Sequence, residues 1–218
     1  MRTKFDQQLA QLNHEMIEMG ALCEEVIALS SRALTEGNVA LAAKVGPLDS
    51  EIDHKEREIE NLCLKLLLQQ QPVARDLRQI SAALKMITDM ERIGDQAEDI
   101  AEIVGFLGGR QAENDGLLKK MAEAVIQMVT ESVDAYVKCD IILAKKVIAD
   151  DDYVDDCFAR IKQSLISRIA AAPTEGEYAL DLLMIAKYYE RIGDHATNIA
   201  EWVIYSVTGV HKDEITLT

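Results

Sequence analysis

The stretch Glu91-Arg92-Ile93-Gly94-Asp95 recurs without change at Glu190-Arg191-Ile192-Gly193-Asp194. Each copy continues into an Ala-x-x-Ile-Ala-Glu run, which ends at Glu102 in the first copy and at Glu201 in the second. A long identity of this kind within one chain is typical of a duplicated structural unit. We therefore interpret the chain as two related halves, each containing a helix that carries this motif.

The repeat extends well upstream of the motif in both halves. Three further correspondences follow from the printed sequence: 38–45 with 140–147, Asp49 and Asp53 with Asp151 and Asp155, and Pro72 with Pro173. The register between the halves shifts by a few residues near the prolines, where a loop can absorb the difference.

Apolar residues recur at helical spacing through nearly all of the 218 residues. Aromatic residues make up only 5% of the chain and there are three prolines, which favours helices over an all-β fold. Six helices are expected, over about 5–36, 39–70 with an interruption at Gly46-Pro47, 71–104, 114–138, 141–172 and 177–207. Short connections make neighbouring helices antiparallel. The sequence therefore predicts an all-α fold of two tandem three-helix bundles packed side by side, with domains 1–108 and 109–218.

The net charge of −15 argues against a nucleic-acid-binding protein, because such proteins need a basic surface. The N-terminus lacks the apolar run of a signal peptide, and no segment reaches the length of a membrane span. The four cysteines show no metal-type spacing and are expected to be buried, reduced side chains. These features predict a soluble cytoplasmic protein that meets a membrane only through partners.

Acidic residues four apart on a helix lie on one face, and they repel one another. The pairs that are acidic in both halves are Asp49 and Asp151, Asp53 and Asp155, Glu91 and Glu190, Asp95 and Asp194, and Glu102 and Glu201. Asp99 continues the first series, whereas its counterpart Asn198 is neutral. A mid-helix glycine, Gly94 or Gly193, adds a cost of about 1 kcal/mol relative to alanine.

A bound cation would compensate for these costs. Carboxylates from two neighbouring helices could converge on a hard metal ion such as Fe, Mn, Mg, Zn or Ca, and the sequence leaves its identity open. A metal-dependent enzyme or a metal store would use the same residues. Glu51-x-x-His54 occurs once only, which disfavours a di-iron oxidase. In the simpler alternative, Arg92 and Arg191 neutralise solvated acids and the glycines serve helix packing.

The paired motifs, with an Asp-x-x-x-Asp on the preceding helix of each half, resemble those of the PhoU family over about residues 3–210. The resemblance implies a cytoplasmic, often dimeric regulator of the phosphate-specific ABC transporter, without established catalytic activity. It also implies repression of phosphate-starvation signalling when phosphate is plentiful. Such a homodimer would link the ATPase subunit of the transporter to a sensor histidine kinase.

Some members of that family carry metal clusters on their E(D)-x-x-x-D motifs. By resemblance, those ligand positions are Asp49, Asp53, Glu91 and Asp95 in the first half and Asp151, Asp155, Glu190 and Asp194 in the second. Asn198 departs from the acidic pattern of Asp99, so weaker binding is expected in the second half. The sequence leaves open whether phosphate itself is bound.

Overall fold

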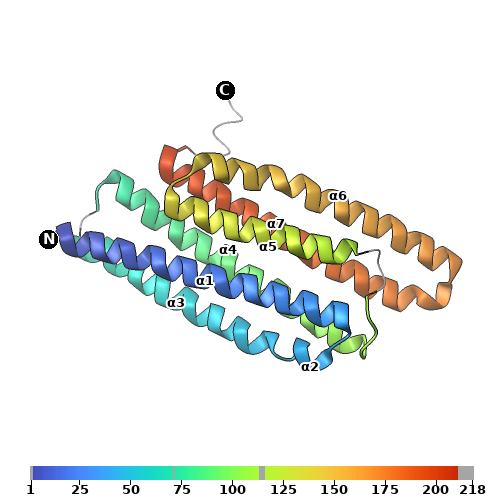
Figure 1. The fold of residues 1–218 in the computed structure, drawn as a ribbon. Coiled ribbons are helices and arrows are strands. Elements are labelled where there is room, and N and C mark those ends of the chain that lie inside the picture. The colour runs from blue at the N-terminus through green and yellow to red at the C-terminus, as the bar shows by residue number, and fades with distance from the viewer. Residues whose placement is uncertain (1, 71, 113–115, 211–218) are drawn as a thin grey trace.

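The computed structural model describes residues 2–112, except residue 71, and residues 116–210. Every regular element within these ranges is helical (Figure 1). The helices are α1 (Arg2–Glu36), α2 (Val39–Ala42), α3 (Val45–Gln70), α4 (Ala74–Phe106), α5 (Leu117–Lys138), α6 (Ile141–Ala171), the short 3₁₀ helix η1 (Pro173–Glu175) and α7 (Gly176–Thr208). The predicted all-α fold with six long helices is confirmed. The expected helix starts at Gln71 and Asn114 lie outside the described residues.

The interruption expected near Gly46-Pro47 is present, but the break itself lies slightly earlier, at Ala43 and Lys44. It divides the predicted second helix into the four-residue α2 and the long α3. Pro47 then falls in the first turn of α3, where its missing N–H removes no intrahelical hydrogen bond.

Equivalent residues begin the helical segments that follow the first helix of each half. The Asn38 side chain accepts a hydrogen bond from the backbone N–H of Leu41 at 3.0 Å. The Asp140 side chain accepts from the N–H groups of Ile142 and Leu143, at 2.9 and 3.0 Å. Such side chains satisfy backbone donors that have no partner within the helix. The alignment of the two halves therefore holds at the level of single side chains.

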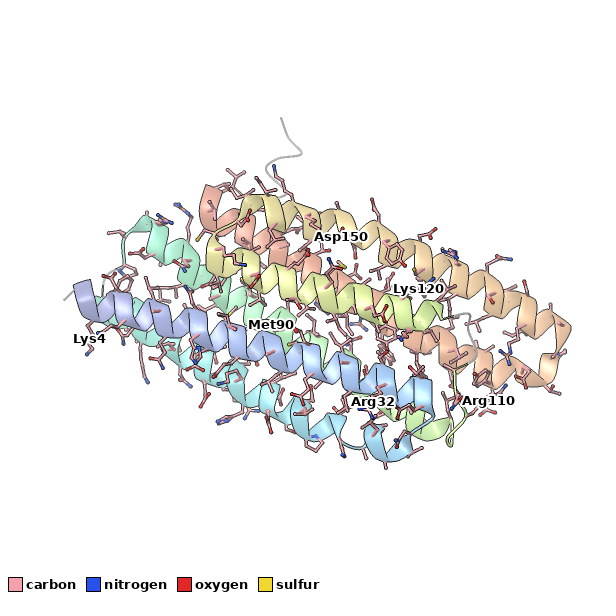
Figure 2. All side chains as sticks on the ribbon, viewed as in Figure 1. Lys4, Arg32, Met90, Arg110, Lys120 and Asp150 are labelled. Atoms are coloured by element: carbon pink, nitrogen blue, oxygen red, sulfur yellow. The ribbon has the colours of Figure 1, made fainter. Side chains whose placement is uncertain are left out.

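The first half consists of α1, α3 and α4, with α2 at one end, and the second half consists of α5, α6 and α7. The halves run in opposite directions and lie side by side, with α1 against α5 and α4 against α7 (Figure 1). One continuous apolar core crosses this boundary and includes Met90, which lies between the helices in Figure 2. Most charged side chains lie at the periphery (Figure 2).

The connection between the halves is held against the end of α1. The backbone N–H of Ala112 donates to the carbonyl of Leu34, and the Gln111 side chain donates to the carbonyl of Glu36. The Tyr178 hydroxyl at the start of α7 donates to the carbonyl of Gln111 at 2.8 Å. These contacts fix the relative placement of the two halves near this end of the molecule.

Cys23, Cys63 and Cys157 are buried and Cys139 is partly buried, all as free thiols. Over the part of the chain that the structure describes, no helix is both long and apolar enough to cross a bilayer.

Candidate carboxylate sites

The mid-helix glycine of each motif makes room for an aspartate from the neighbouring helix. A Cβ placed on Gly94 of α4 would lie 2.4 Å from Oδ1 of Asp49 on α3 and 3.1 Å from Cδ1 of Ile52. Asp49 is only 8% exposed, and its Oδ1 is buried without a hydrogen-bond partner among the described residues. Gly94 therefore lets the Asp49 carboxylate lie against the backbone of α4, in space that a larger residue at this position would take from it.

The second half repeats this arrangement. A Cβ on Gly193 of α7 would lie 2.9 Å from Oδ1 of Asp151 on α6. That Oδ1 is also buried and unpartnered within the described ranges. The distance is longer than in the first half, and Asp151 is less completely buried than Asp49.

We call Asp49, Asp53, Glu91 and Asp95 the first carboxylate site, and Asp151, Asp155, Glu190 and Asp194 the second carboxylate site. Burial raises the pKa of Asp49 to about 7, with further contributions from the charges of Glu98, Asp95, Asp53 and Glu91. All the predicted members of the first site therefore lie close enough to act on Asp49.

Burial likewise raises the pKa of Asp151 to about 6, and the charges of Asp155, Asp194 and Glu190 add to the effect. The two aspartates thus share two features, a glycine beneath the carboxylate and other carboxylates around it. These surroundings disfavour the negative charge of the isolated groups.

Arginine lies at one edge of the first site. The Arg92 guanidinium donates to Asp95 at 2.8 Å, and its Nε lies 3.3 Å from the Glu91 carboxylate. Arg57 lies 3.4 Å from the Asp53 carboxylate and is mostly exposed. Neutralisation by Arg92, the simpler alternative from the sequence, is therefore present in part, but neither arginine bonds to the buried Oδ1 of Asp49.

The outer members of the predicted sets lie nearer to the boundary between the halves or to solvent. Burial raises the pKa of Asp99, as do the nearby charges of Glu102 and Asp95, whereas Arg191 of the second half lowers it. Glu102 is exposed and Glu201 is partly buried. These positions extend the acidic surface away from Asp49.

Asn198 contributes to a polar contact between α4 and α7. Its side-chain amide donates to the Asp89 carboxylate at 3.1 Å, and Nδ1 of His195 lies 2.9 Å from the same carboxylate oxygen. Asp89 and His195 are each more than four-fifths buried. The contact joins the two halves beside the carboxylate sites.

The requirement that a ligand be acidic in both halves leaves out Glu56 and Glu98, whose counterparts Phe158 and Thr197 are not acidic. The structure places both glutamates beside the first site. Glu98 exerts the largest charge effect on the pKa of Asp49, and Glu56 acts on Glu91. The signal in the sequence was their helical spacing, which places Glu56 three residues after Asp53 and Glu98 three residues after Asp95.

The donor chemistry of both sites suits a hard cation, because carboxylate oxygens are its preferred ligands and one buried oxygen in each site has no partner. Within the described ranges, however, no three His, Cys, Asp or Glu side chains already converge on one point at metal-binding distance. Several of these carboxylates would have to turn toward one another to share an ion.

Gly94→Ala tests the proposed role of this glycine. We expect the alanine Cβ to displace the Asp49 carboxylate and to return its pKa toward the usual range. The stability should change by no more than about 1 kcal/mol, because the displaced atom ends a rotatable side chain and alanine favours the helix. A carboxyl NMR titration and urea unfolding would check both expectations. Gly193→Ala should have a smaller effect on Asp151, and an unchanged Asp49 pKa would contradict the prediction.

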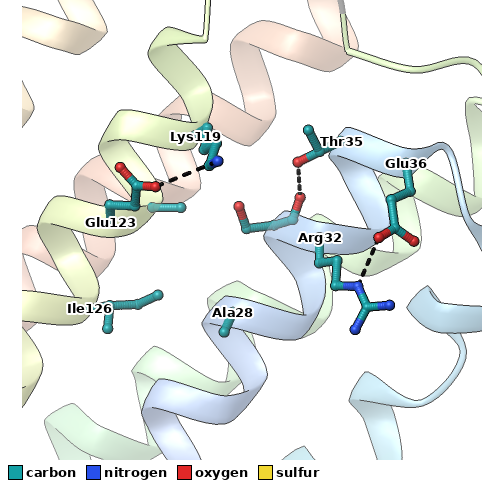
Figure 3. Close-up of a pocket in the computed structure, with 9 residues that line it drawn as sticks. Ala28, Arg32, Thr35, Glu36, Lys119, Glu123 and Ile126 are labelled. Atoms are coloured by element: carbon teal, nitrogen blue, oxygen red, sulfur yellow. Dashed lines mark hydrogen bonds and ion pairs between the residues drawn. The ribbon is translucent and has the colours of Figure 1, made fainter.

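A separate groove of about 340 Å³ lies between α1 and α5, away from the helices that carry the carboxylates (Figure 3). Charged side chains of opposite sign line it and pair locally, as Arg32 does with Glu36 and Lys119 with Glu123 (Figure 3). This local pairing gives the groove no preference for a ligand of either charge.

Comparison with known proteins agrees with this architecture. The family model described as "PhoU domain" matches the chain twice, over residues 16–104 and 118–203. A protein of Clostridium acetobutylicum, named "Phosphate-specific transport system accessory protein PhoU homolog", is 35% identical over 97% of this chain and 98% of its own length. A Rhizobium meliloti protein of the same name is 33% identical over 98% of this chain and 94% of its own length.

Solved structures give the same result. The crystal structure of PhoU from Pseudomonas aeruginosa covers 94% of this chain and 100% of its own chain, with a TM-score of 0.88 at 33% identity. The phosphate transport system regulatory protein PhoU from Streptococcus pneumoniae superimposes over 94% of this chain and 98% of its own, with a TM-score of 0.86 at 25% identity. The resemblance identified from the duplicated motif is confirmed.

Proposed function

The chain belongs to the PhoU family, and we propose that it acts as an accessory protein of a phosphate-specific transport system. The observation that carries this proposal is the double match to the family, together with relatives of that name aligned over nearly the whole chain. In this proposal the protein is cytoplasmic and has no catalytic activity of its own.

The proposed action is a coupling between two partners. The protein would link the ATPase subunit of the phosphate transporter to a sensor histidine kinase and repress the starvation response when phosphate is plentiful. Such coupling requires that binding of one partner change the affinity for the other. Two related halves that share one core suit this role, because packed side chains connect them and would carry a shift at one half to the other. We further propose that the protein forms a homodimer.

The carboxylate sites have a supporting role in this proposal. A hard cation would be held by Asp49, Asp53, Glu91 and Asp95, and a second by Asp151, Asp155, Glu190 and Asp194. Asp99, Glu102, Asn198 and Glu201 would contribute from the outer end. The buried, unpartnered oxygens of Asp49 and Asp151 support this assignment. When bound, the cation would supply positive charge that lets the acidic helices pack without mutual repulsion.

Pull-down with the purified transporter ATPase and the sensor kinase from the same cell tests the proposed function. We expect the chain to retain both partners, and the presence of one to change retention of the other by several-fold. The double variant Asp49→Asn/Asp151→Asn should lose any dependence on added Mn²⁺, whereas the exposed Glu51→Gln should behave as the original chain. Failure to retain either partner, with and without Mn²⁺, would refute the proposal.

A further inference from the structure

We propose that the outer side of the α3–α4 hairpin is a docking surface for an amphipathic helix of a protein partner. That helix would carry basic residues over most of one face and apolar residues at one end of the same face. This inference rests on the proposed coupling to protein partners, because it assigns a surface to one of them. It follows from side chains on both helices that change from apolar to acidic in the same direction.

Four exposed aliphatic side chains lie around the turn between α3 and α4. Leu64 and Leu68 lie one helical turn apart near the end of α3, with 45% and 83% of their surfaces exposed. Val73 directly precedes α4 and is 66% exposed, and Leu77, one turn further, is 47% exposed. Single exposed aliphatic residues are common on protein surfaces, whereas several at one turn form a patch. We call Leu64, Leu68, Val73 and Leu77 the apolar tip.

The register of the two helices brings these side chains together. The Thr88 hydroxyl donates to the Glu56 carboxylate at 3.4 Å, and the Asp49 carboxylate lies against Gly94, so α3 and α4 are antiparallel. Continued toward the turn, this register places the end of α3, with Leu68, opposite the first two turns of α4. The turn lies at the same end of the molecule as the start of α1 (Figure 1).

Acidic residues continue this surface away from the apolar tip. Glu60 lies one turn before Leu64 on α3, and on α4 the sequence Leu77, Leu84, Glu91 has spacings of seven residues. Residues at these spacings share one face of a helix. We call the acids on this side of the hairpin the acidic stretch, and they are Asp49, Asp53, Glu56 and Glu60 on α3 and Glu91, Asp95 and Glu98 on α4.

The acidic stretch keeps an excess of negative charge although two arginines pair with it. Arg92 pairs with Asp95 and Glu91, and Arg57 pairs with Asp53. Both guanidinium groups are more than half exposed, so solvent weakens these ion pairs. The acids also outnumber the two arginines. Further basic side chains brought by a partner would therefore be attracted to this surface.

An amphipathic helix complements both parts of the surface at once. Its apolar end would cover the apolar tip, while its basic residues would face the acidic stretch. Between Asp49 and Leu68, α3 rises about 30 Å, the length of a partner helix of about 20 residues. The negative charge opposes nucleic acids and anionic membranes. The part of the chain that the structure describes also offers no strand edge to which an extended peptide could add.

Binding of a synthetic peptide to the full chain tests this inference. The probe is a helical peptide of about 20 residues, with arginines along one face and leucines at one end of that face. A control peptide has the same composition, with its arginines and leucines distributed around the helix. We expect the probe to bind at least about tenfold more tightly than the control peptide, as measured by fluorescence anisotropy. Chelator treatment of the protein prevents competition from metal ions.

Two substitutions on the surface should weaken binding of the probe. Leu68→Ser should do so at least about tenfold, whereas Ile142→Ser, at an equally exposed position of α6, should have no effect. Glu60→Gln should weaken binding several-fold and reduce its dependence on salt, with the exposed Glu51→Gln as the control. Circular dichroism would verify that each variant is folded. In the pull-down with the two proposed partners, Leu68→Ser should lose one partner and Ile142→Ser should retain both.

Three results would overturn the proposed surface: equal binding of the two peptides, equal affinities of Leu68→Ser and Ile142→Ser for the probe, and retention of both partners by Leu68→Ser. Analytical ultracentrifugation gives a further test. Self-association of the original chain that Leu68→Ser abolishes would assign the apolar tip to a second copy and would also overturn the proposal. The transport role is tested separately, because it fails only if the original chain does not retain its partners.

Discussion

Gly37→Ala is expected to destabilise the protein by about 3 kcal/mol, more than alanine at Gly94, Gly105 or Gly193. Gly37 has a positive φ of 63°, which costs about 1 kcal/mol for a residue with a side chain. A Cβ there would also lie 2.3 Å from the carbonyl oxygen of Gly109 in the connection between the halves. Because that contact is with backbone, the connection itself would have to move.

Moving the connection would affect more than one turn. The hydrogen bonds from Ala112 to Leu34 and from Gln111 to Glu36 hold this segment against α1, and Tyr178 holds it against α7. Displacement of the segment therefore weakens the attachment of both halves. Urea unfolding of Gly37→Ala would measure the loss.

Gly105→Ala is the matched control for this prediction. Gly105 lies in the last turn of α4, and apart from its chain neighbours and the backbone of its own helix no heavy atom in the described part of the chain lies within 4 Å of a Cβ built on it. Alanine there should stabilise the protein by a few tenths of a kcal/mol up to about 1 kcal/mol. Equal stability of the two variants would show that the connection does not fix the halves.

The helices and their ends were predictable because the signals are local. The residues Asn38 and Asp140 are good helix caps, the apolar stripes have helical spacing, and the duplicated motif aligns the halves. Local signals do not determine how far a helix break lies from its proline, and the sequence therefore placed the break at Gly46-Pro47 rather than at Ala43 and Lys44. The antiparallel arrangement of the halves depends on long-range packing, which no short motif encodes.

The carboxylate sites were predictable to a similar degree. Helical spacing brought Asp49, Asp53, Glu91 and Asp95 onto facing helices, and the paired glycines indicated close approach. The requirement that a ligand be acidic in both halves assumed that the halves had remained equivalent. It removed Glu56 and Glu98, which lie beside the first site. The two halves have diverged at these positions, so the requirement of acidity in both halves left out glutamates that lie beside the first site.

The raised pKa of Asp49 predicts an unusual pH dependence of stability. Its pKa is about 7 in the folded chain and near 3.8 in the unfolded chain, so between these values the folded state binds more protons. Stability must therefore rise as the pH falls through this window. Asp151, with a pKa of about 6, acts in the same direction. Ion pairs lower the pKa of surface acids such as Glu18 and Glu36. These groups therefore reduce stability only as the pH falls below their ordinary pKa near 4.5.

The chelator-treated protein should accordingly be more stable at pH 5 than at pH 8. A difference of three pH units in pKa corresponds to about 4 kcal/mol at most, and partial solvation of the site reduces the expected gain to about 2 kcal/mol. Asp49→Asn should remove most of this dependence and make the protein about 2 kcal/mol more stable at pH 8, because the amide occupies the same space without the charge. Urea unfolding at pH 5, 6.5 and 8 would measure both effects.

Asp156→Asn, at an exposed position of α6, is the control and should leave the pH dependence of stability unchanged. A stability that falls toward pH 5 in the original chain would contradict the assignment of Asp49 as a buried, unneutralised acid.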